Sequence, residues 1–172
     1  RQGPLRLSEN TLCDQGQRRS VTRSDTVELV AEFLELPSEQ AVIWQDSETD
    51  LAMKARFDIF GQDYLVEIKT TLDPRPEMMQ KACYRFGYHR QAALYLDAGQ
   101  MLQPDCEHRL IVIGTAEPHE VAVYRFTSDA LGSGRRENHR DLSALAECKT
   151  FDQWTHYTHI MELQLPRWAE VA

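Results

Sequence analysis

Residues 54–71, KARFDIFGQDYLVEIKTT, predict a β-hairpin. The first strand ends at Asp58, a tight turn follows at 61–62, and the second strand runs over 64–71. The glycine of the turn is typical of a hairpin connection. The hairpin therefore brings the acidic residue of the first strand back beside the charged residues of the second.

The second strand carries two charged side chains on one face. Because side chains alternate along a strand, Glu67 and Lys69 point the same way while Ile68 points into the core. The hairpin places Asp58 beside this pair. Two carboxylates and one amine are the minimum set for holding a hard divalent cation and activating a water next to it.

A solvated strand face is the alternative, because exposed charged pairs are ordinary on edge strands. The apolar neighbours Leu65, Val66 and Ile68 favour a strand that is buried on at least one face. Buried charges need partners or a metal ion.

Further segments resemble the nuclease domain of the exodeoxyribonuclease VIII type, a branch of the PD-(D/E)XK superfamily that includes phage lambda exonuclease. The matching pieces are KARFD at 54–58, EIKTT at 67–71, GYHRQAALYLD at 87–97, PHEVAVY at 118–124 and LQLPRWA at 163–169. The resemblance implies an α/β, restriction-endonuclease-like core, with a mixed sheet flanked by helices. We expect this domain to occupy residues 24–172, preceded by an irregular arm over 1–23.

The resemblance also implies roles for individual residues. Asp58 and Glu67 match the metal-binding acids, with the carbonyl of Ile68 and the carboxylate of Glu39 as further candidate ligands. Lys69 matches the lysine that orients the attacking water. On the following helix Gln91 matches a catalytic glutamine, and the predicted DNA contacts are Arg56, Tyr88, Arg85 and His89. Relatives often carry another histidine upstream, but no histidine precedes His89 here.

The activity implied by the resemblance is a Mg²⁺-dependent exonuclease, with Mn²⁺ able to substitute. It would degrade linear double-stranded DNA ends from 5′ to 3′ as a homo-oligomeric ring and pass the 3′ strand to a single-strand annealing recombinase. Two alternatives stay open: a structure-specific endonuclease with the same site chemistry, and a non-catalytic DNA-binding subunit with the same fold.

Composition fits a single domain of 172 residues with no membrane-spanning run and no signal peptide, so we expect a cytoplasmic protein. The net charge of −8 argues against a uniformly basic DNA-binding surface but allows a basic channel. The four scattered cysteines favour reduced thiols over a zinc site. Since the first residue is Arg1, we expect that the chain begins inside a longer product or that a disordered start was omitted.

The remaining pattern predicts the order of elements. Helices are expected over 26–36, capped by Ser24 or Asp25, over 77–98 with a break at Gly87, and over 128–149; strands are expected over 41–45, 109–114 and 121–126. On the second helix one continuous face would carry Tyr84, Tyr88, Gln91 and Tyr95, the outer two packing on the sheet. A short helical piece at 154–159, followed by Leu163, Leu165 and Trp168, would close the domain.

Overall fold

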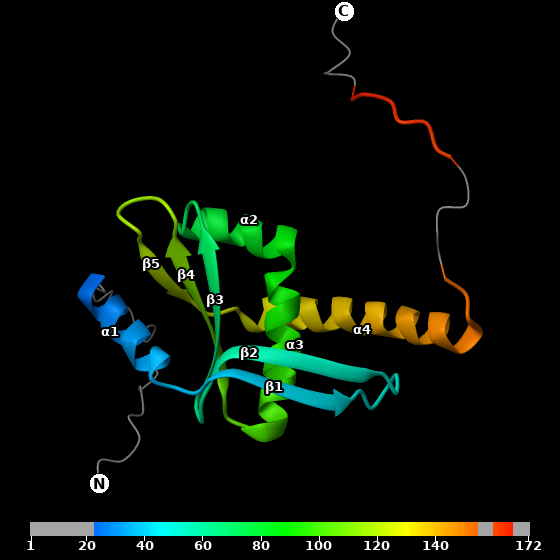
Figure 1. Cartoon of the computed structure of the whole chain (residues 1–172), viewed down its shortest axis with the longest axis horizontal. Helices are drawn as coiled ribbons and strands as arrows, with labels where there is room; N and C mark the ends of the chain where they lie inside the picture. The colour runs from blue at the N-terminus through cyan, green and yellow to red at the C-terminus, as the bar shows by residue number, and fades with distance from the viewer. Residues whose placement is uncertain (1–22, 155–159, 167–172) are drawn as a thin grey trace, which may run out of the picture.

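A mixed five-stranded sheet lies at the centre of the computed structural model, which describes residues 23–154 and 160–166 (Figure 1). The strand order is β1-β2-β3-β4-β5, in which β3 and β4 run parallel and the other neighbours run antiparallel. The elements are α1 (Arg23–Leu34), β1 (Ser38–Gln45), β2 (Ala52–Phe60), β3 (Tyr64–Thr71), α2 (Pro76–Phe86), α3 (Tyr88–Leu102), β4 (Glu107–Gly114), β5 (Val121–Tyr124) and α4 (Ser128–Phe151). The predicted α/β class with a mixed sheet and flanking helices is confirmed.

The parallel pair arises because α2 and α3 carry the chain from the end of β3 back to the start of β4. Strands β3 and β4 are buried on both faces, and Leu65, Val66 and Val112 are fully inaccessible. On one face α1 packs Phe33 against Ile59, whereas on the other face α3 packs against a second apolar cluster. The charged residues of β3 therefore belong to a rigid central strand.

Gly87 separates α2 from α3, as the sequence predicts. Its φ of 69° is left-handed, and its N–H donates to the carbonyls of Cys83 and Tyr84 to close α2. The break makes the predicted continuous face wrong at Tyr84, which is 81% exposed on α2 instead of packed on the sheet. Tyr95, on α3, packs edge-on against Phe57 as expected.

Helix α4 crosses α3 at its closest near Gly134. A Cβ built at this glycine would lie 2.5 Å from the carbonyl oxygen of His89 and 3.1 Å from the Cβ of Ala93. The backbone of α3 therefore rests directly on α4, and the missing side chain permits the contact.

Gly134→Ala should lower the free energy of unfolding by about 1–3 kcal/mol, because the added methyl group must push two helices apart. Gly132→Ala is the matched control on the same helix, since its Cβ would meet only the end of Arg136 at 3.5 Å. The control should be neutral or stabilising by up to about 1 kcal/mol. Urea unfolding of both variants measures the difference, and equal stabilities would contradict this packing.

The end of the described chain corrects one expectation. Leu163 and Leu165 do not close the domain, because they are 97% and 67% exposed on a segment that runs away from the body (Figure 1). Of the helical piece expected at 154–159, residues 155–159 lie outside the described residues. Trp168 and residues 1–22 of the arm expected over 1–23 also lie outside them. Helix α1 begins at Arg23, so Ser24 and Asp25 lie within it and are not its cap.

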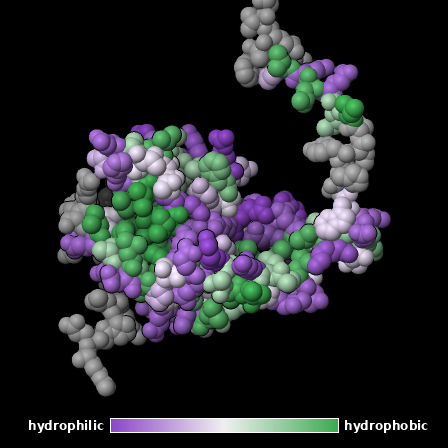
Figure 2. Space-filling model, viewed as in Figure 1, coloured by the Kyte–Doolittle hydropathy of each residue, from purple (hydrophilic) through white to green (hydrophobic). Residues whose placement is uncertain are grey.

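Hydrophobic side chains also gather on the face of the sheet that lies between α1 and α2 in Figure 2. Partly buried residues of that face include Ile68, Ile113, Val121 and Val123. None of the helices in the described ranges is both long and apolar enough to span a bilayer.

Candidate active site

The candidate site lies at a fork between β2 and β3. The two strands pair only at Ile59 with Val66 and at Phe60 with Leu65, after which β2 leaves β3 and continues along β1. Asp58 is the first residue beyond the last pair, and in the same register it faces Glu67. The prediction that Asp58 ends the strand was wrong, because β2 continues to Phe60. The hairpin places Asp58 opposite Glu67, as expected.

Asp58 fills the gap that the diverging backbone leaves. Its Oδ2 accepts a hydrogen bond from the N–H of Ile68 at 2.8 Å, in place of a ladder partner. The N–H and C=O of one strand residue point to the same side. The Ile68 carbonyl, a predicted metal ligand, therefore also faces the fork and lies on the edge where Asp58 sits.

Glu67 is the most buried charged residue of the site, with 5% of its surface exposed. Its Oε1 accepts from Lys69 Nζ at 2.5 Å and from Gln91 Nε2 at 2.8 Å. Its Oε2 is buried and has no hydrogen-bond partner among the described residues. Burial raises the pKa of the Glu67 carboxyl above its ordinary value, although the Lys69 ammonium opposes this shift. A free carboxylate oxygen in this position favours a cation.

Lys69 lies between Glu67 and an aromatic ring of α3. Its ammonium nitrogen is 5.2 Å from the centroid of the Tyr88 ring, which is cation–π distance. The Lys69 side chain is 22% exposed. The ammonium is therefore held near the acids while one side of it reaches solvent, and a bound phosphate could approach from there.

The oxygen donors at the fork suit a hard divalent cation. Glu67 Oε2, the Asp58 carboxylate and the Ile68 carbonyl would supply a few oxygen ligands and leave water to complete the shell, which is how Mg²⁺ usually binds. Within the described ranges, no three acidic, histidine or cysteine side chains cluster in a way that could hold a metal ion. Any metal here would therefore depend on two acids and the main chain.

The structure places Glu39, a predicted metal ligand, at the protein surface, and its ligand role stays a prediction. Its side chain is 63% exposed and pairs with Arg56 at 3.1 Å, and its own backbone is left-handed, with φ 58°. Strand β1 begins at Ser38, three residues before the predicted start at residue 41, so Glu39 lies inside the strand. The left-handed backbone of Glu39 carries a side chain that lies on the surface. The ion pair also engages Arg56, a predicted DNA contact that is itself exposed.

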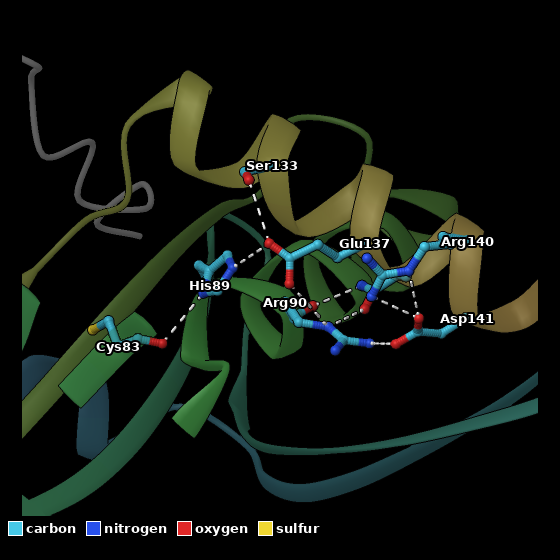
Figure 3. A network of polar contacts seen from close by, with 8 residues as sticks. Cys83, His89, Arg90, Ser133, Glu137, Arg140 and Asp141 are labelled. Atoms are coloured by element: carbon cyan, nitrogen blue, oxygen red, sulfur yellow. Dashed lines mark hydrogen bonds and ion pairs between the residues drawn. The ribbon is translucent and has the colours of Figure 1, made fainter. Parts of the chain in front are cut away.

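His89 is buried between α3 and α4, and its contact with DNA stays a prediction. It is 8% exposed, with Nδ1 3.2 Å from the carbonyl of Cys83 and Nε2 3.1 Å from Glu137 Oε1 (Figure 3). The break at Gly87 places His89 in the first turn of α3, facing α4, so it no longer shares a face with Arg85. Arg85 lies exposed beside the ring of Phe86, where it stays a predicted DNA contact.

The contacts of α3 with α4 include charged residues that the sequence pattern does not reveal. Glu137 also accepts from Ser133, and its pKa is lowered chiefly by its hydrogen bond with His89 (Figure 3). Arg90 pairs with Asp141 at 2.5 Å. The paired residues are 48 and 51 positions apart in the chain, so no local signal identifies them.

His108 was also not foreseen as a neighbour of the site. It is buried on β4, and burial, with smaller effects of Arg109 and Lys69, lowers its pKa to about 4. At neutral pH His108 therefore adds no positive charge to the site.

Comparison with known proteins supports a relationship over most of the chain. Residues 16–164 match the family described as "PDDEXK-like domain of unknown function (DUF3799)". A crystal structure from Eubacterium rectale with the name "Putative exonuclease" aligns with a TM-score of 0.62 and 9% identity, covering 84% of this chain and 61% of that one. A second structure, named SSO0001, aligns with a TM-score of 0.39 and 15% identity over 77% of this chain and 58% of the other. No curated protein matches the sequence.

Proposed function

The chain belongs to the family of PDDEXK-like domains of unknown function (DUF3799), and on this premise we propose that it is a metal-dependent nuclease that hydrolyses phosphodiester bonds. The restriction-endonuclease-like fold expected from the sequence is confirmed by this membership and by the structural match. The observation that carries the activity is the convergence of Asp58, Glu67 and Lys69 at the fork. Intact acids and lysine argue against a non-catalytic subunit.

Each residue has a distinct task in this proposal. Nucleases with this fold generally use divalent metal ions, and a bound Mg²⁺ would lower the pKa of a water and polarise the phosphate. Asp58, Glu67 and the Ile68 carbonyl would hold the ion. Lys69 orients the attacking water and offsets charge that develops on the phosphate oxygens. Gln91 keeps Glu67 Oε1 in place through its 2.8 Å hydrogen bond and so leaves Oε2 directed to the fork.

The substrate that we propose is a linear double-stranded DNA end, cleaved from 5′ to 3′. Support comes from the sequence pieces that resemble the exodeoxyribonuclease VIII type, with EIKTT at 67–71 and GYHRQAALYLD at 87–97 at the fork and on the adjoining helix. The similar crystal structure carries the name "Putative exonuclease", and the present chain spans 61% of it.

We also propose a homo-oligomeric ring and a single-strand annealing recombinase as partner. A small acidic domain has little basic surface, and several copies around one channel would multiply the contacts with DNA. Closed symmetry is the usual form of such assemblies.

The protein should degrade linear duplex DNA in Mg²⁺ and leave a covalently closed circle of the same sequence intact. The physical reason is that an end-dependent enzyme needs a free terminus to enter its channel. Gel analysis of both substrates, with Asp58→Ala as the inactive control, measures this. Rapid cutting of the closed circle would favour the endonuclease alternative, and equal inertness towards both substrates would contradict a nuclease.

A further inference from the structure

A cavity of about 470 Å³ lies between α2, the start of α3, the end of β5 and the start of α4. This volume falls in the range of about 300–1,000 Å³ that small-molecule sites occupy. Its floor is apolar and includes Met79 and Leu110. None of the catalytic roles assigned above uses this cavity.

Aromatic rings form much of its wall, namely those of Tyr84, Tyr124 and Phe126. Tyr84 is 81% exposed and lies nearly parallel to the His89 ring, with centroids 6.4 Å apart. An aromatic ring exposed to this extent at the mouth of an apolar cavity offers a flat surface on which another planar ring can stack.

Polar groups lie at the rim and set the kind of ligand that fits. Glu137 and Ser133 line one edge and present hydrogen-bonding oxygens close to His89 (Figure 3). Arg125 lines the cavity, is exposed, and forms no ion pair with any residue in the described ranges. A planar heterocycle attached to a phosphate would satisfy the stacking surface, the polar edge and the arginine together.

Tyr88 packs between the candidate active site and residues that line the cavity. One side of the Tyr88 ring carries the Lys69 ammonium at 5.2 Å. The same residue packs against the cluster of Met79, Leu110 and Val112, of which the first two line the cavity. Tyr88 therefore contacts both Lys69 of the candidate active site and a cluster whose members Met79 and Leu110 line the cavity.

We propose that this cavity binds the base of a nucleotide in the DNA strand that is cleaved. The proposal rests on the nuclease function and assigns a base-stacking site to it. The base lies between the aromatic wall and the Glu137 edge, and Arg125 contacts its phosphate. Stacking on a ring is tolerant of sequence, so the site holds the strand without selecting a particular base.

Two measurements test the proposal, and the first needs no cleavage. Titration with dAMP, followed by NMR, should shift the amide signals of Cys83, Phe126 and Ala130, whereas 2-deoxyribose 5-phosphate should not. Tyr84→Ala should weaken dAMP binding about five- to tenfold, because each stacked base contributes measurably to affinity. Phe151→Ala is the matched control, an exposed aromatic at the far end of α4 that should change nothing.

The second measurement is the kinetics of cleavage of linear DNA. Tyr84→Ala should raise KM several-fold with little change in kcat, whereas Phe151→Ala should leave both unchanged. Failure of dAMP to shift the cavity amides of a protein that cleaves DNA would overturn the base site and leave the nuclease proposal standing. Binding of dAMP without any effect of Tyr84→Ala on KM would assign the cavity to free nucleotides and also overturn the proposal.

The apolar segment 160–166 is the rival occupant. A peptide of this sequence that shifts the same amides, while dAMP shifts none, would assign the cavity to the chain itself. Absence of cleavage of every DNA substrate by the wild-type protein would contradict the proposed function, and the base site with it.

Discussion

Lys69→Ala should reduce the rate of DNA cleavage by about a hundredfold to a thousandfold, the usual effect of removing one group that stabilises charge in the transition state. The Lys69 ammonium lies 2.5 Å from Glu67 Oε1, inside the proposed site. DNA affinity should change by no more than about threefold, because many phosphate contacts share the binding.

Single-turnover cleavage and fluorescence anisotropy on the same linear duplex separate these two effects. Lys149→Ala is the matched control, since Lys149 is an exposed lysine in the last turn of α4, away from the fork. The control should cleave at the wild-type rate. A Lys69→Ala protein that cleaves equally fast, or one that loses cleavage only by losing DNA binding, would contradict the role given to Lys69.

Much of the site follows from the periodicity of one strand. Glu67 and Lys69 are two residues apart, so any strand assignment places them on the same face, and the apolar neighbours favour burial of the strand on at least one face. The hairpin then brings Asp58 near them. These inferences depend on local geometry alone, and the structure agrees with each of them.

The fork itself could not be predicted from the sequence, because it depends on how many residues of β2 pair with β1 and how many pair with β3. Strand β2 pairs with β1 over seven positions but with β3 over two. The Ile68 N–H therefore has no backbone partner on β2 and donates to the Asp58 carboxylate instead. The same preference brings Glu39 into a strand, where its left-handed backbone accompanies a carboxylate paired with Arg56 on the surface.

The prediction from helical spacing that Arg85 and His89 share a face was wrong, because Gly87 divides the expected helix into α2 and α3. Arg85 and His89 are four apart and would share a face on a continuous helix. The break at Gly87 removes that relationship and directs His89 to α4. The glycine was a visible signal for the break, but the new direction of the helix depends on the contact of Gly134 with the His89 carbonyl.

Arginines that could line a basic channel form ion pairs with residues far away in the sequence. Arg90 pairs with Asp141, and Arg135 pairs with Asp97, over separations of 51 and 38 residues. Their charges are thus partly balanced in the folded protein. Sequence alone counts charges but does not reveal which of them are paired, so a basic channel for DNA stays a prediction.

Glu67→Gln should abolish cleavage and stabilise the metal-free protein. Cleavage should fall by about a thousandfold or more, since the variant loses a buried acid that would hold the ion. Stability in EDTA at pH 7 should rise by about 1 kcal/mol, because the buried carboxylate has one oxygen without a partner and a neutral amide has a smaller cost of burial.

The pKa of Glu67 determines how the stability difference between wild type and Glu67→Gln changes with pH. Burial raises the folded-state pKa of Glu67 above its unfolded value. A raised pKa contributes stability that is complete below the unfolded pKa of about 4.3 and is lost as the pH rises through the folded-state pKa. The wild-type protein in EDTA should therefore lose stability relative to Glu67→Gln as the pH rises above about 4.3, and urea unfolding at acidic and at neutral pH measures the difference.

Asp58→Asn is the matched control, because Asp58 is less buried than Glu67 and its carboxylate already accepts from the Ile68 N–H. It should lose cleavage without gaining stability. Added Mg²⁺ or Mn²⁺ should stabilise the wild-type protein in proportion to binding and have little effect on either variant. If Glu67→Gln were no more stable than wild type in EDTA, or if the metal ion stabilised all three proteins equally, Glu67 would not be the cation ligand that its free buried oxygen indicates.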